Sequence, residues 1–306
     1  MPDGVLLVDK PGGETSAGII RILKRTLHPR KIGHLGTLDP MATGVLPLCL
    51  DGGTRIAQFL DAADKGYSGE ILLGLATDTA DITGQETARG EVPALSSELL
   101  ESVASKFLGH REQIPPMYSA VKIKGKQLYK MARAGIEVER QPRPIRIDQF
   151  SLELTSELDR IRFAVECSKG TYVRVLAEEV GAALGCPATL ASLRRTRFGP
   201  FGVSECHELH AIQGCASEKI PVLSCLEALR GVPQVTVDGP RAYQVAVGGK
   251  GCLSGLSLPA GASRVALVEP AGELLAIVDC DPGGSWQLRR VLYPDAVDLY
   301  RPTARC

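Results

Sequence analysis

The chain has 306 residues and a mass of 32.6 kDa, and its 44% apolar and 23% charged residues are typical of a globular protein with room for about two domains. Its 35 basic residues equal its 35 acidic residues, so a nucleic-acid partner would have to bind a local basic patch rather than an overall positive charge. No segment approaches the roughly 18 apolar residues of a membrane span, and the nine cysteines include no Cys-x-x-Cys pair, which argues against a membrane protein or a disulfide framework and favours a reduced, cytoplasmic protein.

The first 110 residues are predicted to mix strands and helices without a regular β-α-β repeat. The apolar run at 4–8 predicts a buried strand, and a helix is predicted to begin at Thr15 or Ser16. Further apolar and periodic segments predict a strand over 45–50, a helix over 54–63, a strand over 67–75 and an amphipathic helix over 96–108. This mixture predicts an α+β fold.

The sequence pattern of the chain changes near residue 232. Before that point, strands are predicted over 150–154 and 161–167, and an amphipathic helix over 171–184. Beyond it come short β-like runs, QVTV, YQVAV, RVALVEP and LLAIVD, separated by Gly, Pro and Asp turns. We therefore predict two domains, one over 1–232 and a small β-rich one over 233–306.

Charge is unevenly distributed within the predicted first domain. The segment 111–146 contains nine basic residues and three acidic ones, together with Tyr118 and Tyr129. Cationic and aromatic side chains in combination suit RNA phosphates and bases, whereas a basic face that is simply solvated is the common alternative. The mixture favours an insertion that grips RNA.

Several signatures of other enzyme classes are absent from the sequence. There is no G-x-x-x-x-G-K-[ST], no G-x-G-x-x-G after a strand, no H-E-x-x-H and no G-x-S-x-G. Cys206, His207 and His210 lie close together, but such residues at the start of a polar helix more often fill surface and core than bind a metal. We therefore expect no metal and no organic cofactor.

Six segments in order along the chain carry a more specific pattern. They are DKPGGETS (9–16), GHLGTLDPMATGVLPLCL (33–50), KGYSGEILLG (65–74), QIPPMYSAVKIKGKQLYKMARAGIEVER (113–140), CSKGTYVRVLAEEVG (167–181) and ASLRRT (191–196). Together they resemble the TruB family of pseudouridine synthases, which isomerise uridine 55 in the T-loop of tRNA. The resemblance implies a pseudouridine-synthase core, with a mixed, mostly antiparallel sheet flanked by helices, and a small C-terminal PUA-like barrel that binds RNA.

Asp39 is the single carboxylate of the second segment, and a proline follows it. By spacing alone, Asp-Pro in a stretch rich in Gly and Thr predicts a turn. The resemblance implies instead that Asp39 is the catalytic residue, in a loop that a flipped uridine can reach. The reaction breaks the N-glycosidic bond, turns the uracil and joins C5 to C1′ with loss of the C5 proton, and a carboxylate can serve as nucleophile or base. The sequence leaves open whether Asp39 attacks C6 or C1′ or removes the 2′ proton.

The resemblance assigns three more residues to the pocket around the target base. Tyr67 corresponds to the tyrosine that packs on the base, although a strand tyrosine by itself is usually part of the core. Arg174 corresponds to the arginine that pairs with the catalytic aspartate and keeps it ionised, and Tyr172 corresponds to a wall of the pocket. Without the resemblance, Tyr172 and Arg174 would be interpreted as the two sides of a helix start.

Three further residues match positions of the family. Leu193 corresponds to an apolar residue that touches the target nucleotide, and a core leucine is the alternative. His34 corresponds to a histidine beside the extruded nucleotide, where its ring fills the vacancy in the T-loop; the alternative is a histidine satisfied by backbone hydrogen bonds. Lys10 belongs to the Lys-Pro pair of the family, for which we expect structural support of the catalytic loop rather than a phosphate contact.

Two other functions are compatible with parts of this pattern. A non-catalytic tRNA binder or folding chaperone would keep the basic and aromatic residues but could lose the acid, and Asp39 is present. An aspartyl-phosphate phosphotransferase would need a second acid or a metal cluster near its nucleophile, and no D-x-D accompanies Asp39. We therefore expect an isomerase that acts on the T stem-loop of tRNA, with no membrane partner and no obligate protein partner implied.

Overall fold

The computed structural model describes residues 3–61, 63–119, 121–123, 125–216, 219–249 and 251–292. The strands are β1 (Gly4–Lys10), β2 (Ile32–His34), β3 (Thr43–Leu50), β4 (Lys65–Leu73), β5 (Leu75–Thr77), β6 (Glu86–Arg89), β7 (Gly109–Gln113), β8 (Lys122–Ile123), β9 (Lys126–Gln127), β10 (Arg143–Leu154), β11 (Arg160–Cys167), β12 (Ala188–Phe198), β13 (Phe201–Gly202), β14 (His207–Glu208), β15 (Val222–Leu223), β16 (Gln234–Thr236), β17 (Arg264–Val268), β18 (Leu274–Cys280) and β19 (Trp286–Val291). The helices are α1 (Ser16–Leu27), α2 (Ala57–Leu60), α3 (Ser97–Ser105), α4 (Leu128–Arg133), α5 (Val173–Leu184), α6 (Leu209–Gln213), α7 (Cys225–Ala228) and α8 (Gly239–Ala246), with 3-10 helices η1 (Asp51–Arg55) and η2 (Val203–Glu205).

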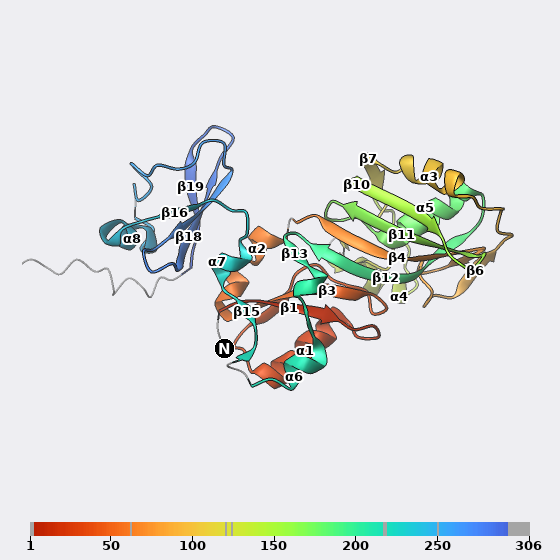
Figure 1. Ribbon diagram of the computed structural model, residues 1–306, viewed down its shortest axis with the longest axis horizontal. Coiled ribbons are helices and arrows are strands. Elements are labelled where there is room, and N and C mark those ends of the chain that lie inside the picture. The colour runs from red at the N-terminus through yellow and green to blue at the C-terminus, as the bar shows by residue number, and fades with distance from the viewer. Residues whose placement is uncertain are drawn as a thin grey trace, which may run out of the picture.

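An eleven-stranded sheet forms the centre of the larger part of the molecule (Figure 1). Eight strands follow the order β14-β1-β3-β12-β4-β11-β10-β7, and β2, β13 and β15 pair onto β3, β12 and β1. The pairs β1–β14 and β3–β12 are parallel and the other pairs of this sheet are antiparallel. The predicted α+β fold with a mixed, mostly antiparallel sheet flanked by helices is therefore confirmed.

The alternation along β11 shows how the core is built. Ile161, Phe163, Val165 and Cys167 are buried, while the residues between them are half-buried or exposed, as expected for a strand with one face on the core. These side chains join a cluster with apolar residues of α3 and α5, and each large apolar side chain buried in this way contributes roughly 1.5–3 kcal/mol. The sheet carries α5, which packs against β12.

The first helix begins where its sequence predicts. Thr15 caps α1, since its Oγ1 accepts a hydrogen bond of 2.8 Å from the N–H of Gly18. Ile19 and Leu23 are fully buried at helical spacing. The helix ends at Leu27, and His28 after it adopts the left-handed conformation with φ 49°.

The helix predicted over 54–63 is wrong in extent. The chain instead forms η1 and then the four-residue α2. Asp51 has a positive φ of 46°, and a Cβ added to Gly53 would lie 2.0 Å from the backbone oxygen of Gly4. The backbone therefore turns tightly against β1, which leaves no room for a regular first helical turn.

The prediction of a β-like structure for the YQVAV run is also wrong, because this run forms the end of α8. Its buried residues Ala242, Val245 and Ala246 have the spacing of one helix face, and Pro240 lies in the first turn. A short apolar run does not distinguish a strand from a buried helical segment.

The smaller part contains a second sheet in the order β16-β17-β18-β19, with α8 packed on β18 (Figure 1). Among the described residues, which stop at Leu292, this sheet is open, because β16 and β19 form its two edges rather than pairing with each other. A closed barrel is thus not found there. No helix in the described ranges has the length and apolar character needed to cross a membrane.

Candidate active site

Asp39 lies in the loop between β2 and β3, and a buried lysine fixes this loop. Lys10 is fully buried, and its Nζ donates hydrogen bonds to the carbonyl oxygens of Pro11 (2.9 Å), Pro40 (3.1 Å) and Ala42 (2.6 Å). Two of these oxygens belong to Pro40 and Ala42, which follow Asp39 closely in the chain. The contacts fit the structural role expected for Lys10.

Arg174 makes the direct contacts with Asp39. Its Nε lies 3.0 Å from Asp39 Oδ2, and its Nη2 donates to Oδ1 at 3.4 Å. The Arg174 side chain is 6% exposed and that of Asp39 is 36% exposed, so the carboxylate faces outward with the guanidinium behind it. The pairing implied by the family resemblance is therefore present in the geometry.

Backbone oxygens and a second acid hold the guanidinium in place. Arg174 Nη1 donates to Thr79 O at 2.9 Å and Nη2 donates to Tyr118 O at 2.7 Å. Arg174 Nη1 also lies 3.8 Å from Oδ2 of Asp81, a buried carboxylate whose Oδ1 accepts hydrogen bonds from Thr79 Oγ1 and from the backbone and hydroxyl of Thr83. One arginine thus serves two carboxylates, which fixes its position from both sides.

The charge of Asp39 depends on this arginine. Burial raises the pKa of the Asp39 carboxyl above its ordinary value, because a low-dielectric surrounding disfavours the anion. The Arg174 guanidinium opposes the rise, whereas the Asp81 carboxylate adds to it. The Arg174 guanidinium therefore favours the ionised form of the Asp39 carboxyl against the effect of burial.

Tyr67 and Leu193 lie on the neighbouring strands β4 and β12. Both are buried, with 8% exposure each, and both belong to the main apolar cluster. Leu193 pairs with Gly69, two residues from Tyr67 on β4, so Leu193 and Tyr67 are diagonal neighbours on the same face of the sheet. Burial raises the pKa of the Tyr67 phenol and the Arg195 guanidinium opposes this rise, so Tyr67 is a neutral phenol.

Tyr172 directly precedes α5, and a buried glutamine holds it. Its N–H donates to Gln113 Oε1 at 2.7 Å, and its carbonyl oxygen accepts from Gln113 Nε2 at 3.2 Å. This two-way contact joins the start of α5 to the end of β7. Because Arg174 follows two residues later, the same contact helps to set the helix that carries it.

His34 is not brought to Asp39 by any contact found among the described residues. It ends β2, half-buried, and its Nδ1 is buried without a hydrogen-bond partner in the described structure. Burial lowers the pKa of His34, with a further lowering by Arg195 and an opposing effect of Asp61. Burial therefore favours the neutral ring, and the backbone-satisfied histidine of the alternative interpretation does not describe its Nδ1.

A pocket of about 360 Å³ borders the loop and the sheet. Met41 of the loop, Thr43 at the start of β3 and Leu193 of β12 line it, but Asp39, Tyr67 and Arg174 do not. Its other lining residues are Ser68, Gly69, Glu70, Arg162, Ser192 and Arg194. The pocket therefore lies beside the Asp39 loop and does not contain the contact between Asp39 and Arg174.

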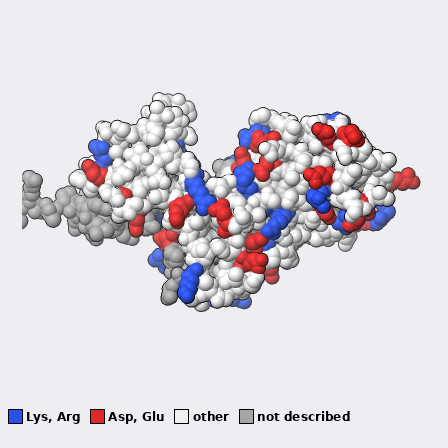
Figure 2. Space-filling view, in the orientation of Figure 1, with Lys and Arg blue, Asp and Glu red and all other residues white. Residues whose placement is uncertain are grey.

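The basic segment expected to grip RNA is partly neutralised. Arg111 and Arg146 each pair with carboxylates, and on the face shown in Figure 2 basic and acidic side chains alternate over the larger part of the molecule. Exposed basic side chains in this segment are Lys126, Lys130 and Arg143, whereas Lys124 lies outside the described residues.

Cys206, His207 and His210 do not form a metal-binding group. Across the described ranges, no cluster of three or more His, Cys, Asp or Glu side chains is placed to hold an ion. His210 Nδ1 instead lies 3.1 Å from Glu208 Oε2 on the surface.

Sequence reasoning missed three residues of the site: Asp81, Gln113 and Arg195. Gln113 begins the segment 113–140 and Arg195 lies within ASLRRT, so both residues are part of the family motifs but had no role assigned to them. Asp81 lies in a Thr- and Asp-rich turn, where an acid usually satisfies the local backbone.

The sequence matches two profiles of one family. The profile "TruB family pseudouridylate synthase (N terminal domain)" matches residues 24–173. The profile "tRNA pseudouridylate synthase B C-terminal domain" matches residues 174–229. The first match contains Asp39, and the second begins at Arg174.

Curated relatives are similar over nearly the whole chain. The tRNA pseudouridine synthase B of Aromatoleum aromaticum is 43% identical over 292 residues, which is 95% of this chain and 92% of the relative. That of Dechloromonas aromatica is 41% identical over 300 residues, which is 96% of this chain and 97% of the relative.

Solved structures share the fold. A chain of "Crystal Structure of a Cbf5-Nop10-Gar1 Complex" matches with a TM-score of 0.72 and 28% identity, covering 97% of this chain and 86% of that one. A chain of "Structure of H/ACA RNP bound to a substrate RNA containing 2'-deoxyuridine" matches with a TM-score of 0.70 and 25% identity, again over 97% of this chain and 86% of that one.

Proposed function

This chain belongs to the TruB family of pseudouridylate synthases, and from this premise we propose that it isomerises uridine 55 in the T-loop of tRNA to pseudouridine. The observation that carries the proposal is the contact of Asp39 with Arg174, in which a partly exposed carboxylate is backed by a buried guanidinium. The relatives named tRNA pseudouridine synthase B support tRNA as the substrate.

The Asp39 carboxylate is the reacting group of this proposal. The isomerisation breaks the bond between N1 and C1′ and forms one between C5 and C1′, while the C5 proton leaves and N1 gains a proton. Every atom is conserved and no electrons are exchanged with a cofactor, so the step needs a positioned nucleophile or base rather than a redox group. Arg174 keeps Asp39 ionised for either role.

The target uridine must leave its stack before Asp39 can reach it, at a cost of a few kcal/mol. In our proposal Tyr67 packs on the flipped base and Leu193 contacts the nucleotide, while Tyr172 forms a wall of the pocket. His34 fills the vacancy that the uridine leaves in the T-loop. Stacking on aromatic side chains then returns part of the lost stacking energy.

The rest of the chain supplies RNA affinity in this proposal. Residues 1–232 form the catalytic domain. Within it, residues 111–146 form an insertion whose exposed basic side chains bind the phosphates of the T stem-loop. Residues 233–306 form a PUA-like domain that binds RNA, for which the apolar strands β17 and β18 provide the framework. The cytoplasm is the expected compartment, since the eight cysteines within the described ranges are all free.

The proposed function is tested by incubating the purified protein with a T stem-loop transcript and mapping pseudouridine by chemical modification. We expect product at the T-loop uridine with the unaltered chain and none with Asp39→Asn, which keeps the shape and loses the charge. The variant should still bind tRNA, because affinity comes largely from contacts elsewhere. If Asp39→Asn forms product at the full single-turnover rate, Asp39 is not the reacting group. If neither protein forms product, the proposed function is wrong.

A further inference from the structure

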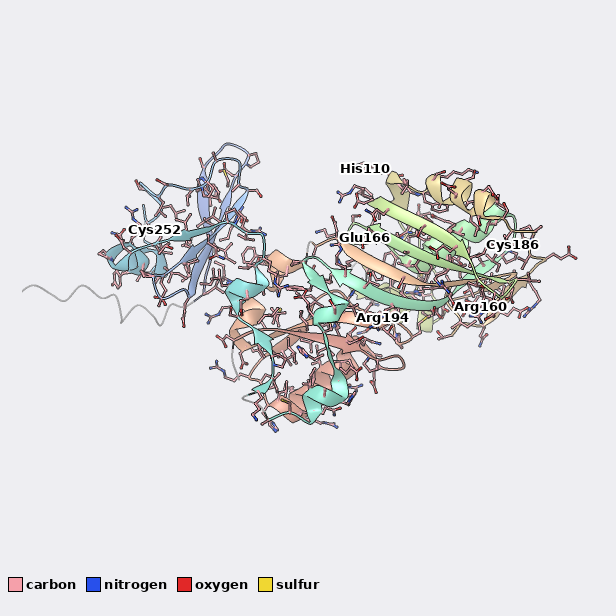
Figure 3. The ribbon with its side chains drawn as sticks, in the orientation of Figure 1. His110, Arg160, Glu166, Cys186, Arg194 and Cys252 are labelled. Carbon is pink, nitrogen blue, oxygen red and sulfur yellow. The ribbon has the colours of Figure 1, made fainter. Side chains whose placement is uncertain are left out.

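Arg195 is a fully buried cation without a carboxylate partner in the described structure. Its neighbours on β12 have such partners, since Arg194 pairs with Asp9 and Arg197 pairs with Glu166; Arg194 and Glu166 are labelled in Figure 3. Arg195 is 0% exposed and donates to backbone oxygens instead. Burying a charge without an opposite charge costs several kcal/mol, and a well-packed apolar side chain would often be more stabilising. Stability alone therefore does not account for an arginine here.

The backbone oxygens that Arg195 holds lie at both ends of the Asp39 loop. Its Nη2 donates to Gly36 O at 2.9 Å, just before the loop, and its Nε donates to Val45 O at 2.7 Å, just after it. A third oxygen, that of Leu35, lies 3.5 Å from Nη2. One planar group thus joins the two ends of the segment that presents Asp39.

The guanidinium also lies against Tyr67. Arg195 and Tyr67 are cross-strand partners in the β12–β4 pairing, which places their side chains on the same face of the sheet. Each of the two groups shifts the pKa of the other toward its charged form, which is consistent with direct proximity. Arg195 therefore contacts the loop of the acid and the residue proposed to pack on the base.

The loop in turn lies directly on this guanidinium. Gly36 has a positive φ of 61°, and a Cβ there would lie 3.0 Å from Arg195 Nη1 and 2.7 Å from the ring of Phe198. The same ring lies 5.2 Å from the Arg195 guanidinium carbon. Gly36 thus allows the backbone to approach closely enough for its oxygen to accept the hydrogen bond.

We propose that Arg195 is a positioning residue for pseudouridine formation. It fixes the distance between the Asp39 loop and Tyr67, so that the Asp39 carboxylate and the Tyr67 ring contact the flipped uridine at the same time. The inference rests on the function proposed above. A lysine in its place would carry the charge but would offer a single nitrogen, which cannot hold Gly36 O and Val45 O from two edges of one planar group. Misplacing a reacting group by about 1 Å can cost about 100-fold in rate.

The test compares Arg195→Lys with Arg197→Lys, a control on the same strand that also conserves charge. Single-turnover rates with saturating enzyme and binding of a T stem-loop are measured well below the melting temperature of each variant. We expect Arg195→Lys to lower the rate about 10- to 100-fold with RNA affinity changed by less than about threefold. Arg197→Lys should keep the rate of the unaltered chain.

A double variant separates positioning from general support of the fold. If Arg195 acts through Tyr67, then Arg195→Lys combined with Tyr67→Phe should be slowed less than the product of the two single effects. Multiplicative effects, or a folded Arg195→Lys with an unaltered rate, would overturn the inference while product formation by the unaltered chain leaves the proposed function intact. If Arg195→Lys does not fold, Arg195→Gln, which removes the buried charge, replaces it in the test, and the same slowing is expected. If neither variant folds, Arg195 is a structural residue and the inference is also overturned.

Discussion

Arg174 faces two carboxylates of different accessibility. Asp39 is 36% exposed at its side chain, whereas Asp81 is 7% exposed and is satisfied by threonine donors. The buried acid lies 3.8 Å from the guanidinium, whereas the partly exposed acid contacts the guanidinium at 3.0 Å and can still meet a substrate. A planar group with donors on several edges can make both contacts at once, which a single ammonium cannot do.

Replacing Arg174 by lysine tests this arrangement through pH. Burial raises the pKa of Asp39 and Arg174 lowers it, so Arg174→Lys should let the pKa rise further. The active carboxylate is lost as the pH falls through that pKa, and the acid limb of the single-turnover rate should therefore move to higher pH. We also expect a rate about tenfold or more below that of the unaltered chain at neutral pH. An unchanged profile and rate would show that Arg174 does not control the charge of Asp39.

The contact of Asp39 with Arg174 could be predicted because each residue lies within a recognisable motif of the sequence. Asp81 could not, because an acid in a turn carries no periodic or motif signal. It reaches the site through tertiary structure: the turn bridges to Leu190 of β12, and the Ile82 N–H donates to Leu190 O at 2.9 Å. Roles that depend on such long-range contacts are invisible in one sequence.

At the scale of the elements, the approach of β3 to β12 places the Asp39 loop beside the sheet. The two strands pair in parallel only at Thr43 with Arg194 and at Gly44 with Arg195. Gly44 has a positive φ of 99°, and a Cβ there would lie 2.2 Å from the backbone oxygen of Arg195. Glycine is thus required at this junction for space and for conformation.

Gly44→Ala should therefore separate the two strands. We expect a loss of about 3 kcal/mol or more in the free energy of unfolding, because strain at positive φ adds to a backbone clash. The matched control is Gly13→Ala, which has a similar φ of 87° but no atom within 4 Å of the added Cβ; it should lose only about 1–2 kcal/mol. Denaturant unfolding measures both, and equal losses would contradict the role given to the close approach.

The hairpin of β8 and β9 provides a test of RNA binding. Neutralising Lys122, Lys124 and Lys126 together to Gln should weaken tRNA binding and reduce its salt slope by roughly two to three, because each phosphate contact releases condensed counterions. Chemistry on bound RNA should be kept. The control is an equal change of charge on exposed residues of α1, namely Arg21, Lys24 and Arg25 to Gln. A salt slope that is unchanged by the hairpin variant would assign its lysines to solvent.

The element predictions succeeded where local signals were strong and failed where tertiary contacts decided. The caps at Thr15 and Ser96 mark the starts of α1 and α3. No element was predicted over 188–198, yet this is β12, one of the longest strands, because its buried and polar residues follow a register that shifts twice against β4. A bulged strand between two neighbours loses the simple alternation on which prediction relies.

At the scale of the whole molecule, the two parts share an apolar cluster. Ile56 and Phe201 of the larger part are fully buried in it together with Ile277 and Leu292 of the smaller part. Polar contacts cross the same boundary, since Arg55 donates to the Leu292 carbonyl oxygen and the Arg264 guanidinium lies 4.6 Å from the centroid of the Phe59 ring. The smaller part is therefore attached by packing as well as by the chain.

Deleting the chain after Val232 should thus have two separable effects. Exposure of Ile56 and Phe201 should lower the melting temperature, and loss of the proposed RNA-binding domain should weaken binding of full-length tRNA more than of a T stem-loop, on which some activity should remain. The control is Phe59→Ala in the full-length chain, which weakens the boundary but keeps the domain and should lower the melting temperature with little change in the preference for full-length tRNA. Binding and single-turnover assays on both RNAs distinguish the effects. A truncated chain that is folded but inactive on every RNA would place the smaller part within the active site, because the residues of the acidic centre all precede Val232 and would otherwise be sufficient for the reaction.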